Sequence, residues 1–223
     1  MKNRSKKSKG FTLIEVLVVV TIISILITAG VVGLGNISAG KGTGTAIATC
    51  ESLFEEARTI AISKRCKARV LIDIDDPEDD GYLRRIVIVH EDTTDPSYDP
   101  DSGTDGPWIL ASRGYVMPGG TYFSKIYSTL EDGSPLNEQT LTGSNVKADY
   151  QKNYAYYEFN GEGIFTEAGS DFVIGSGVRP KGQEPRTKSG ERDFAGFVIW
   201  RNGSTSTYRN IQQMELPASL TNF

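Results

Sequence analysis

Three aspartates in one short loop have the residue type and spacing of a calcium site. Asp99, Asp101 and Asp105 lie close together in a segment that also contains glycine. Calcium binds several oxygen ligands supplied by flexible loops of this kind. A calcium loop of the common type that began at Asp99 would end with a glutamate at position 110, where the chain has Leu110. The loop is either a weak calcium site or a solvated acidic turn, and we expect the second, with no metal and no cofactor.

Catalysis needs a nucleophile and a base at a defined spacing. The chain has one histidine, His90, at the end of a predicted strand. Without a second histidine, a dyad with His90, a Ser-Lys pair or a pair of carboxylates remains, and no spacing singles any of them out. Zinc is also not expected, because the chain lacks a Cys-x-x-Cys pair. We therefore expect that the protein is not an enzyme.

The two cysteines, Cys50 and Cys66, permit one disulfide if their domain is exported. On one unbroken helix they would lie about 24 Å apart along the axis. A disulfide allows roughly 7 Å between Cα atoms. A bridge therefore requires a helix that ends well before Cys66, and the sequence leaves the bridged and free states open.

A single carboxylate, Glu15, lies near the start of a long apolar segment, and it is the only charged side chain from Phe11 to Gly40. Residues 11–32 would span about 33 Å as a helix, enough to cross the hydrocarbon core of a bilayer. A carboxylate inside such a segment is costly and indicates a function. Five basic residues precede the segment and only Lys41 follows closely, so the N-terminus is expected in the cytoplasm and the remainder outside the membrane.

The string KGFTLIEV at residues 9–16 resembles the prepilin signature of type IV pilins and of the pseudopilins of type II secretion. The resemblance implies that a prepilin peptidase cleaves after Gly10 and that Phe11 is then N-methylated. Glu15 becomes the fifth residue of the mature chain, whose carboxylate in this family pairs with the N-terminal amine of a neighbouring subunit. An incoming amine would supply the cation and hydrogen bonds that a buried carboxylate needs.

The same resemblance implies the partners and the location. The partners are the prepilin peptidase and methyltransferase, other pilins or pseudopilins in a filament, and an assembly platform in the inner membrane. The protein is expected to span the bacterial inner membrane once, with its C-terminal domain in the periplasm, before it enters a periplasmic or surface filament.

Charge argues against nucleic acid as a general partner. The 223 residues include 24 Lys and Arg and 28 Asp and Glu, a net charge of −4. Because five of the basic residues precede Gly10, the remaining chain has 19 basic and 28 acidic residues, a formal charge of −9. The short basic run Lys64, Arg65, Lys67 and Arg69 is expected to mark the end of a helix, where cations meet the helix dipole.

Two helical segments are expected on either side of a glycine-rich stretch. Six glycines lie between residues 30 and 44 and weaken the helix there. They form either a soft joint or a segment that unwinds when subunits pack together. From residue 45 to 64, apolar residues recur at three- and four-residue steps, which predicts a stripe that packs on the protein's own sheet.

After residue 67 the pattern changes to short β-rich runs. Strands are expected at 68–74, 83–90, 108–112, 122–127, 154–159, 163–165, 172–174, 194–201 and 205–211. An acidic turn at 75–81 should join the first two as a hairpin, and residues 91–106 and 175–192 should be surface loops. The fold class is α+β, with a long N-terminal spine helix and an antiparallel β-rich head.

The predicted organisation has four parts: a leader at 1–10, a transmembrane and assembly segment at 11–34, a glycine-rich joint with the amphipathic half of the spine at 35–66, and a periplasmic head at 67–223. A spine helix that runs directly into a strand resembles the H-type minor pseudopilins and related minor pilins. The predicted function is therefore a minor pseudopilin of type II secretion. The alternatives are a type IV pilus subunit for adhesion, motility or DNA uptake, and a tethered domain that keeps its leader.

Overall fold

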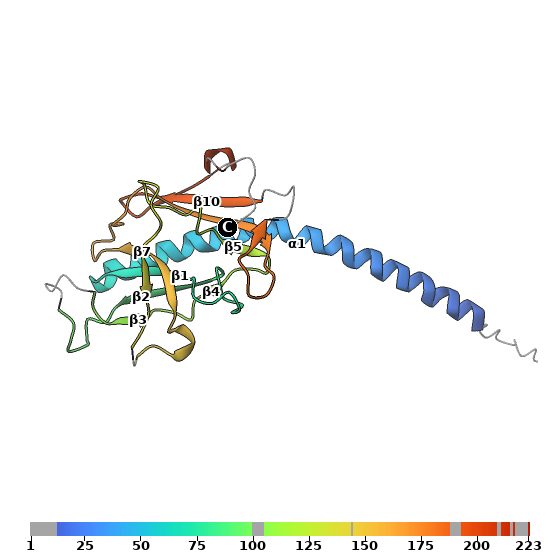
Figure 1. Ribbon diagram of the computed structural model, residues 1–223, viewed down its shortest axis with the longest axis horizontal. Helices are drawn as coiled ribbons and strands as arrows, with labels where there is room; N and C mark the ends of the chain where they lie inside the picture. The colour runs from blue at the N-terminus through green and yellow to red at the C-terminus, as the bar shows by residue number, and fades with distance from the viewer. Residues whose placement is uncertain are drawn as a thin grey trace, which may run out of the picture. The chain divides into compact units, whose positions relative to one another are not determined.

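The computed structural model describes residues 13–99, 105–143, 145–187, 193–208, 211–214, 216 and 223. In the long helix, side chains are described at 13–24 and from residue 42 onward. The chain forms two compact units, Met1–Ser38 and Ala39–Phe223. The second unit contains the amphipathic half of the helix together with every described strand (Figure 1).

Helix α1 runs from Leu13 to Lys64 as one element of 52 residues. It continues through the glycine-rich stretch, although each interior glycine costs up to about 1 kcal/mol relative to alanine. The helix ends in a Schellman motif, in which Arg65 takes a left-handed conformation with φ of 53°. The amide of Cys66 then donates to the Ala61 carbonyl at 3.3 Å. This bond satisfies a carbonyl that would otherwise lack a partner at the helix end.

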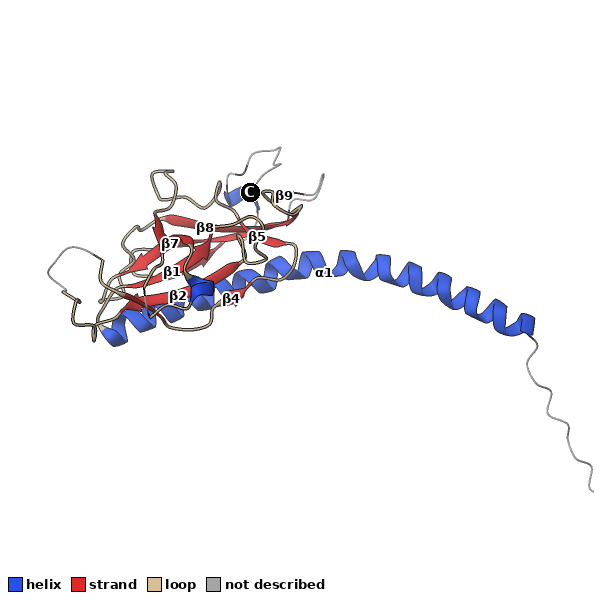
Figure 2. Cartoon of the chain, turned by 60° about the horizontal axis from the view of Figure 1, so that its bottom comes forward, coloured by secondary structure: helices blue, strands red, loops and turns tan. Residues whose placement is uncertain are grey.

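The larger sheet has the strand order β3-β2-β1-β7-β6, and β4 also pairs with β2. Its pairings are antiparallel, and its strands β1, β2, β4 and β7 are labelled in Figure 2. The central strand β1 pairs with β2 through the acidic turn, so the predicted hairpin is confirmed. The strands of this sheet are β1 (Ala68–Asp73), β2 (Arg85–Glu91), β3 (Trp108–Leu110), β4 (Tyr115–Val116), β6 (Glu138–Thr140) and β7 (Asn153–Phe159).

The second sheet has the order β11-β10-β8-β5, with β9 paired to β8, and it is also antiparallel. The α+β class with an N-terminal helix and an antiparallel β-rich head is therefore confirmed. The strands of this sheet are β5 (Thr121–Phe123), β8 (Ser170–Val178), β9 (Arg186–Thr187), β10 (Phe194–Ile199) and β11 (Thr205–Thr207), and two short 3-10 helices lie at Ala148–Tyr150 and Ile211–Met214.

The second half of α1 buries the stripe that the sequence predicts. Its fully buried members are Ala46, Cys50, Phe54, Ala57 and Ala61. Steps of three and four residues place them on one face of the helix. Four of the five side chains are small. The prediction that the stripe packs on the protein's own sheets is confirmed.

Phe54 is the large residue of this stripe, and it lies at the centre of the core. Its ring centroid is 5.1 Å from Tyr157 and 6.4 Å from Phe159, both on β7. It is also 5.4 Å from Phe172 on β8 and 5.1 Å from Phe197 on β10. All four contacts are edge-to-face, an arrangement that aromatic rings favour. One helix residue thereby joins strands of both sheets.

Strand β1 is buried on both faces. Ala68, Val70 and Ile72 belong to the core that contains Phe54. Leu71 points the other way, because side chains of a strand alternate between faces. It belongs to a second apolar cluster on the outer face of the sheet, whose other buried members are Val87, Val89, Leu141, Val146 and Tyr154. Segments that the sequence analysis treated as connections therefore cover this face.

Several strand boundaries differ from the prediction. The expected strand at 163–165 is wrong, because Phe165 makes only an isolated bridge to Phe159. The expected strands at 122–127 and 205–211 end at residues 123 and 207. Strands β4, β6 and β9 were missed, since two or three residues are too few to show a period of two.

The expected loop at 175–192 is also wrong in part, because β8 continues to Val178 and β9 lies within the segment. Gly175 and Gly177 made the segment resemble a loop. In the structure these glycines leave room for neighbours: a Cβ on Gly175 would lie 2.5 Å from the Phe194 ring, and one on Gly177 would lie 2.6 Å from both the Arg186 carbonyl and the Phe223 ring. Close approach, rather than flexibility, explains both glycines.

Replacement of Phe54 by alanine tests the role of this side chain. We expect Phe54→Ala to lower the free energy of unfolding by about 3–5 kcal/mol, because it leaves a cavity among four aromatic rings. Urea unfolding of the full chain in nonionic detergent measures the change. Ile62→Ala is the control, since Ile62 lies on the same helix and is 47% exposed, and its loss should stay below about 1 kcal/mol. Equal losses would contradict the central position of Phe54.

Candidate functional site

The residues of the predicted processing site, Gly10 and Phe11, lie outside the described residues. Glu15 is described and lies in the first turn of α1. A carboxylate is favourable there, because the N-terminus of a helix carries partial positive charge. The structure therefore places the predicted assembly carboxylate on a helix, at an end that suits its charge.

The described N-terminal part of α1 exposes apolar side chains around its whole circumference. From Leu13 to Ile23 the large apolar side chains are 49–83% exposed. The hydroxyl of Thr21 donates to the Leu17 carbonyl at 2.7 Å, so the helix itself satisfies this polar group. A helix that is apolar all round is normally buried, in a protein core or in a membrane.

In the part of the chain that the structure describes, no helix combines the length and the apolarity needed to cross a membrane. The segment predicted to cross, residues 11–32, includes residues 11 and 12 and the side chains of 25–32, which lie outside that part.

The outer face of β1 carries two charged residues on either side of Leu71. Arg69 and Asp73 are both buried, and Asp73 is fully so. Buried charges are tolerated only when they are paired and hydrogen-bonded. Each of these two residues is the hub of its own network, and we name the networks the Arg69 centre and the Asp73 centre.

In the Arg69 centre, the guanidinium contacts acceptors from three other segments. Its Nε donates to Glu158 on β7 at 2.6 Å, and one terminal nitrogen donates to Asp105 at 2.9 Å. The other terminal nitrogen donates to the side-chain oxygen of Gln139 on β6. Burial by itself lowers the pKa of Arg69, but the hydrogen bond to Asp105 and the charge of Glu158 outweigh it and raise that pKa.

Two aromatic rings complete the Arg69 centre. The guanidinium carbon lies 4.3 Å from the ring centroid of Trp108 and 4.0 Å from that of Tyr156. Such cation–π contacts are strongest when water is excluded. The sequence analysis assigned Arg69 to a basic helix end, and this is wrong: Lys64 lies in the last turn of α1, whereas Arg69 is a buried residue of β1.

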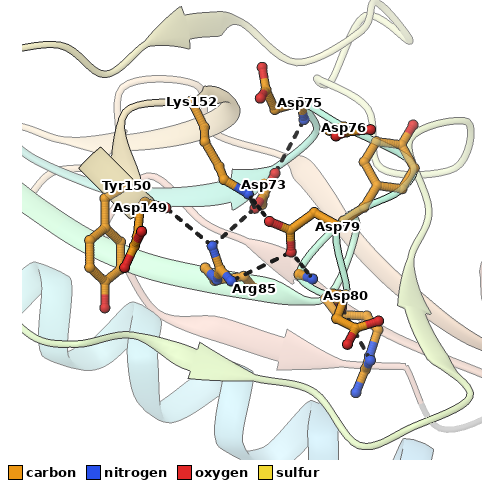
Figure 3. A network of polar contacts seen from close by, with 12 residues as sticks. Asp73, Asp75, Asp76, Asp79, Asp80, Arg85, Asp149, Tyr150 and Lys152 are labelled. Carbon is orange, nitrogen blue, oxygen red and sulfur yellow. Dashed lines mark hydrogen bonds and ion pairs between the residues drawn. The ribbon is translucent and has the colours of Figure 1, made fainter. Parts of the chain in front are cut away.

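The Asp73 centre joins the acidic turn to the start of β7 (Figure 3). Lys152 Nζ lies 3.1 Å from an Asp73 carboxylate oxygen and also contacts Asp79. Arg85 lies 3.6 Å from each of the same two aspartates. Burial raises the pKa of Asp79, but the hydrogen bonds from Lys152 and from the Gly81 amide outweigh it, so that pKa lies below its usual range. Two cations thus balance two carboxylates.

Two of the three calcium candidates are described by the structure, and they line the same cleft. Asp99 and Asp105 line one cleft of 440 Å³, and Asp101 lies outside the described residues. Asp105 already lies 2.7 Å from Arg69 and 3.4 Å from Lys67. A calcium ion at Asp105 would therefore compete with two cations. Among the described residues, no group of three or more His, Cys, Asp or Glu is arranged to hold a metal ion.

The two cysteines and the histidine are buried in the head. Helix α1 continues to Lys64, so the condition for a bridge is not met, and Cys50 and Cys66 are both free and buried. Burial raises the pKa of both thiols, which makes them unreactive. His90 is buried on β2, with its Nδ1 2.8 Å from the Glu91 carbonyl oxygen.

The sequence pattern does not indicate which residues come together in the two charged centres. One feature of the sequence does point to them: Arg69 and Asp73 are the two charged residues of an otherwise apolar strand, and their spacing of four places both on the same face. Their partners carried no such signal. Glu158 is 89 residues from Arg69, and Lys152 is 79 residues from Asp73, so only the pairing of β1 with β7 brings them together.

Comparison with known proteins gives one finding about family. Residues 5–31 match the family model of the prokaryotic N-terminal methylation motif. This match includes the string at 9–16 and supports a structural subunit of the type IV pilin and pseudopilin kind, processed by a prepilin peptidase and assembled with other pilins. No curated protein matches the chain, and no solved structure does.

The Asp73 centre gives a prediction about stability. Lys152→Met leaves Arg85 as the one cation beside the buried Asp73 carboxylate among the described residues, and we expect a loss of about 3–5 kcal/mol at pH 7. Adding Asp73→Asn should restore part of the loss, because an amide needs no counterion. Lys125→Met is the control: Lys125 lies 3.8 Å from Glu138 in an exposed pair, which should contribute less than about 1 kcal/mol.

The same variant should change the response to acid. Because the pKa of Asp79 is lowered on folding, its contribution is present above the unfolded-state value of about 4 and is lost as the pH falls through the lower folded value. The stability difference between the wild type and Lys152→Met should therefore shrink below about pH 4. A difference that stays constant from pH 7 to pH 3 in urea titrations would contradict this assignment.

Proposed function

We propose that the protein is a minor pseudopilin, a structural subunit of the pseudopilus of a type II secretion system, which takes part in protein export across the outer membrane. The observation that carries the proposal is the match of residues 5–31 to the methylation motif. The α+β head that follows the helix is compatible with a subunit that adds a folded domain to a filament.

The proposed location is the bacterial inner membrane, which the chain spans once before assembly, with its head in the periplasm. The basic residues before residue 10 support a cytoplasmic N-terminus. The exposed apolar side chains of α1 support an apolar environment, which is first lipid and then the helices of neighbouring subunits. The same side chains would serve both states.

Glu15 is the proposed determinant of assembly. After cleavage at Gly10, a methylated Phe11 amine of one subunit would pair with the Glu15 carboxylate of its neighbour. A charge pair between apolar helices is strongly preferred over an unpaired carboxylate, because an isolated buried charge is costly. The pair would set the axial position of each subunit when the assembly platform extracts it from the membrane.

The second candidate is a minor subunit of a type IV pilus that serves adhesion, motility or DNA uptake. The methylation motif supports both candidates equally. The spine helix that enters a strand directly, with β1 starting four residues after the end of α1, resembles both minor pseudopilins and minor pilins, so it agrees with both candidates. The two candidates differ in the location of the filament, which is periplasmic for a pseudopilus and on the cell surface for a pilus. This difference is measurable.

Mass spectrometry of cell fractions from the native host tests both the cleavage of the leader and the location of the protein. We expect a peptide that begins at N-methylated Phe11, at low copy, almost wholly in the membrane fraction. The same peptide enriched in sheared surface fibres would favour the pilus subunit. A leader retained in both fractions would contradict the proposed processing and support a tethered domain.

Substitution of Glu15 tests assembly separately from processing. We expect Glu15→Ala to leave membrane insertion and cleavage intact while it lowers incorporation into the filament by more than about tenfold, the effect of roughly 1.4 kcal/mol. Glu56→Ala is the matched control, because Glu56 is an exposed glutamate of the same helix. Crosslinking to neighbouring subunits measures incorporation, and normal crosslinking of Glu15→Ala would disprove the assembly role.

A further inference from the structure

The side chain of Phe223 is buried in an aromatic socket on the second sheet. Its ring centroid lies 5.9 Å from that of Tyr122 on β5 and 5.5 Å from that of Phe194 on β10. Between these two rings it lies against the backbone of β8, where a Cβ on Gly175 or on Gly177 would lie less than 3 Å from it. We name the site formed by Tyr122, Phe194, Gly175 and Gly177 the Phe223 socket.

Strand register places this socket on the face of the second sheet that points away from α1. Tyr122 and Phe194 both lie directly opposite Gly175 in the two pairings of β8, so the three residues share one face. Phe172 is three positions earlier on β8 and points to the other face, because side chains of a strand alternate. There it contacts Phe54 of α1, with 5.4 Å between the ring centroids.

The row of residues next to the socket contacts the helix. Thr121 lies opposite Ser176, and the Ser176 amide donates to the Asp193 carbonyl at 2.8 Å. A Cβ on Gly42 would lie 3.3 Å from the Thr121 hydroxyl. The Thr43 hydroxyl donates to the Asp193 carboxylate at 2.8 Å. The same end of the sheet therefore carries the socket on one face and α1 on the other.

The hydrogen bond from Thr43 to Asp193 holds the beginning of the part of α1 that the head covers. Among the described side chains of this helix, Thr43 is the first that is buried. A hydrogen bond to a carboxylate is stronger than one between neutral groups. Asp193 directly precedes Phe194, whose ring is one wall of the socket. The position of this carboxylate therefore depends on how the socket is filled.

We propose that Phe223 is a clamp that controls how firmly the head holds α1 near residues 42 and 43. With the ring in the socket, the end of the second sheet is closed on Gly42 and Thr43. When the ring leaves, Asp193 moves away from Thr43 and this part of the helix opens locally, while the remainder of the head stays folded. Such local opening costs less free energy than global unfolding. The clamp lies within residues 39–223 and is independent of the proposed function.

Hydrogen exchange of the full chain in nonionic detergent, followed by mass spectrometry, tests the clamp. We expect Phe223→Ala to speed amide exchange in residues 43–50 by at least about tenfold, and in β1 by less than about twofold. Phe165→Ala is the matched control. Phe165 is also a buried phenylalanine, but its ring contacts Tyr157 and Phe159 on β7, so its loss should speed exchange in β1 at least as much as in residues 43–50.

A double variant decides whether the ring acts through Thr43. Thr43→Val removes the donor to Asp193, keeps the shape of the side chain, and should also speed exchange in residues 43–50. Adding Phe223→Ala should then change exchange by less than about twofold beyond the faster single variant, whereas independent effects would multiply.

A milder substitution keeps the test decisive if Phe223→Ala does not fold. Phe223→Leu retains part of the apolar volume and should give a smaller acceleration in the same residues. Unchanged exchange in residues 43–50, an equal acceleration in β1, or multiplied effects in the double variant would overturn the proposal.

Discussion

The contact of Phe54 with four aromatic rings is the interaction on which the head depends. Two of these rings belong to the larger sheet and two to the second sheet, so this one side chain connects both sheets to α1. The other fully buried residues of the stripe are small, and Phe54 supplies its one large side chain. Close packing of this kind tolerates few voids. The amphipathic half of α1 is therefore part of the head rather than a linker to it.

The two halves of α1 differ in how their apolar side chains are distributed and covered. In the second half the apolar side chains form a stripe, and the sheets of the same chain cover it. In the described N-terminal part the apolar side chains surround the helix and remain exposed. A helix that is apolar all round is normally buried, in a protein core or in a membrane. The exposed apolar part lies within residues 5–31, which match the methylation motif. In the proposed filament, neighbouring subunits would cover it.

The outer face of the larger sheet uses charge where the inner face uses aromatic packing. The Arg69 and Asp73 centres lie at opposite ends of β1 and flank the second apolar cluster. Each joins β1 to a segment that lies far away in the sequence, and each requires correct strand pairing to satisfy its charges. A wrong register would leave a charge buried without a partner, which is far more costly than the loss of an apolar contact. The centres thus favour one register of β1.

Sequence by itself determined what depends on local pattern. The apolar segment with Glu15, the stripe of α1, the first hairpin and most of the longer strands follow from charge and from periods of 3.6 and two residues. Tertiary structure decided what depends on distant neighbours: the partners of Arg69 and Asp73, the free state of Cys50 and Cys66, and the close contacts at Gly175 and Gly177. The reason is physical. Periodicity encodes which face a side chain occupies, whereas the pairing of strands sets which distant residue it meets there.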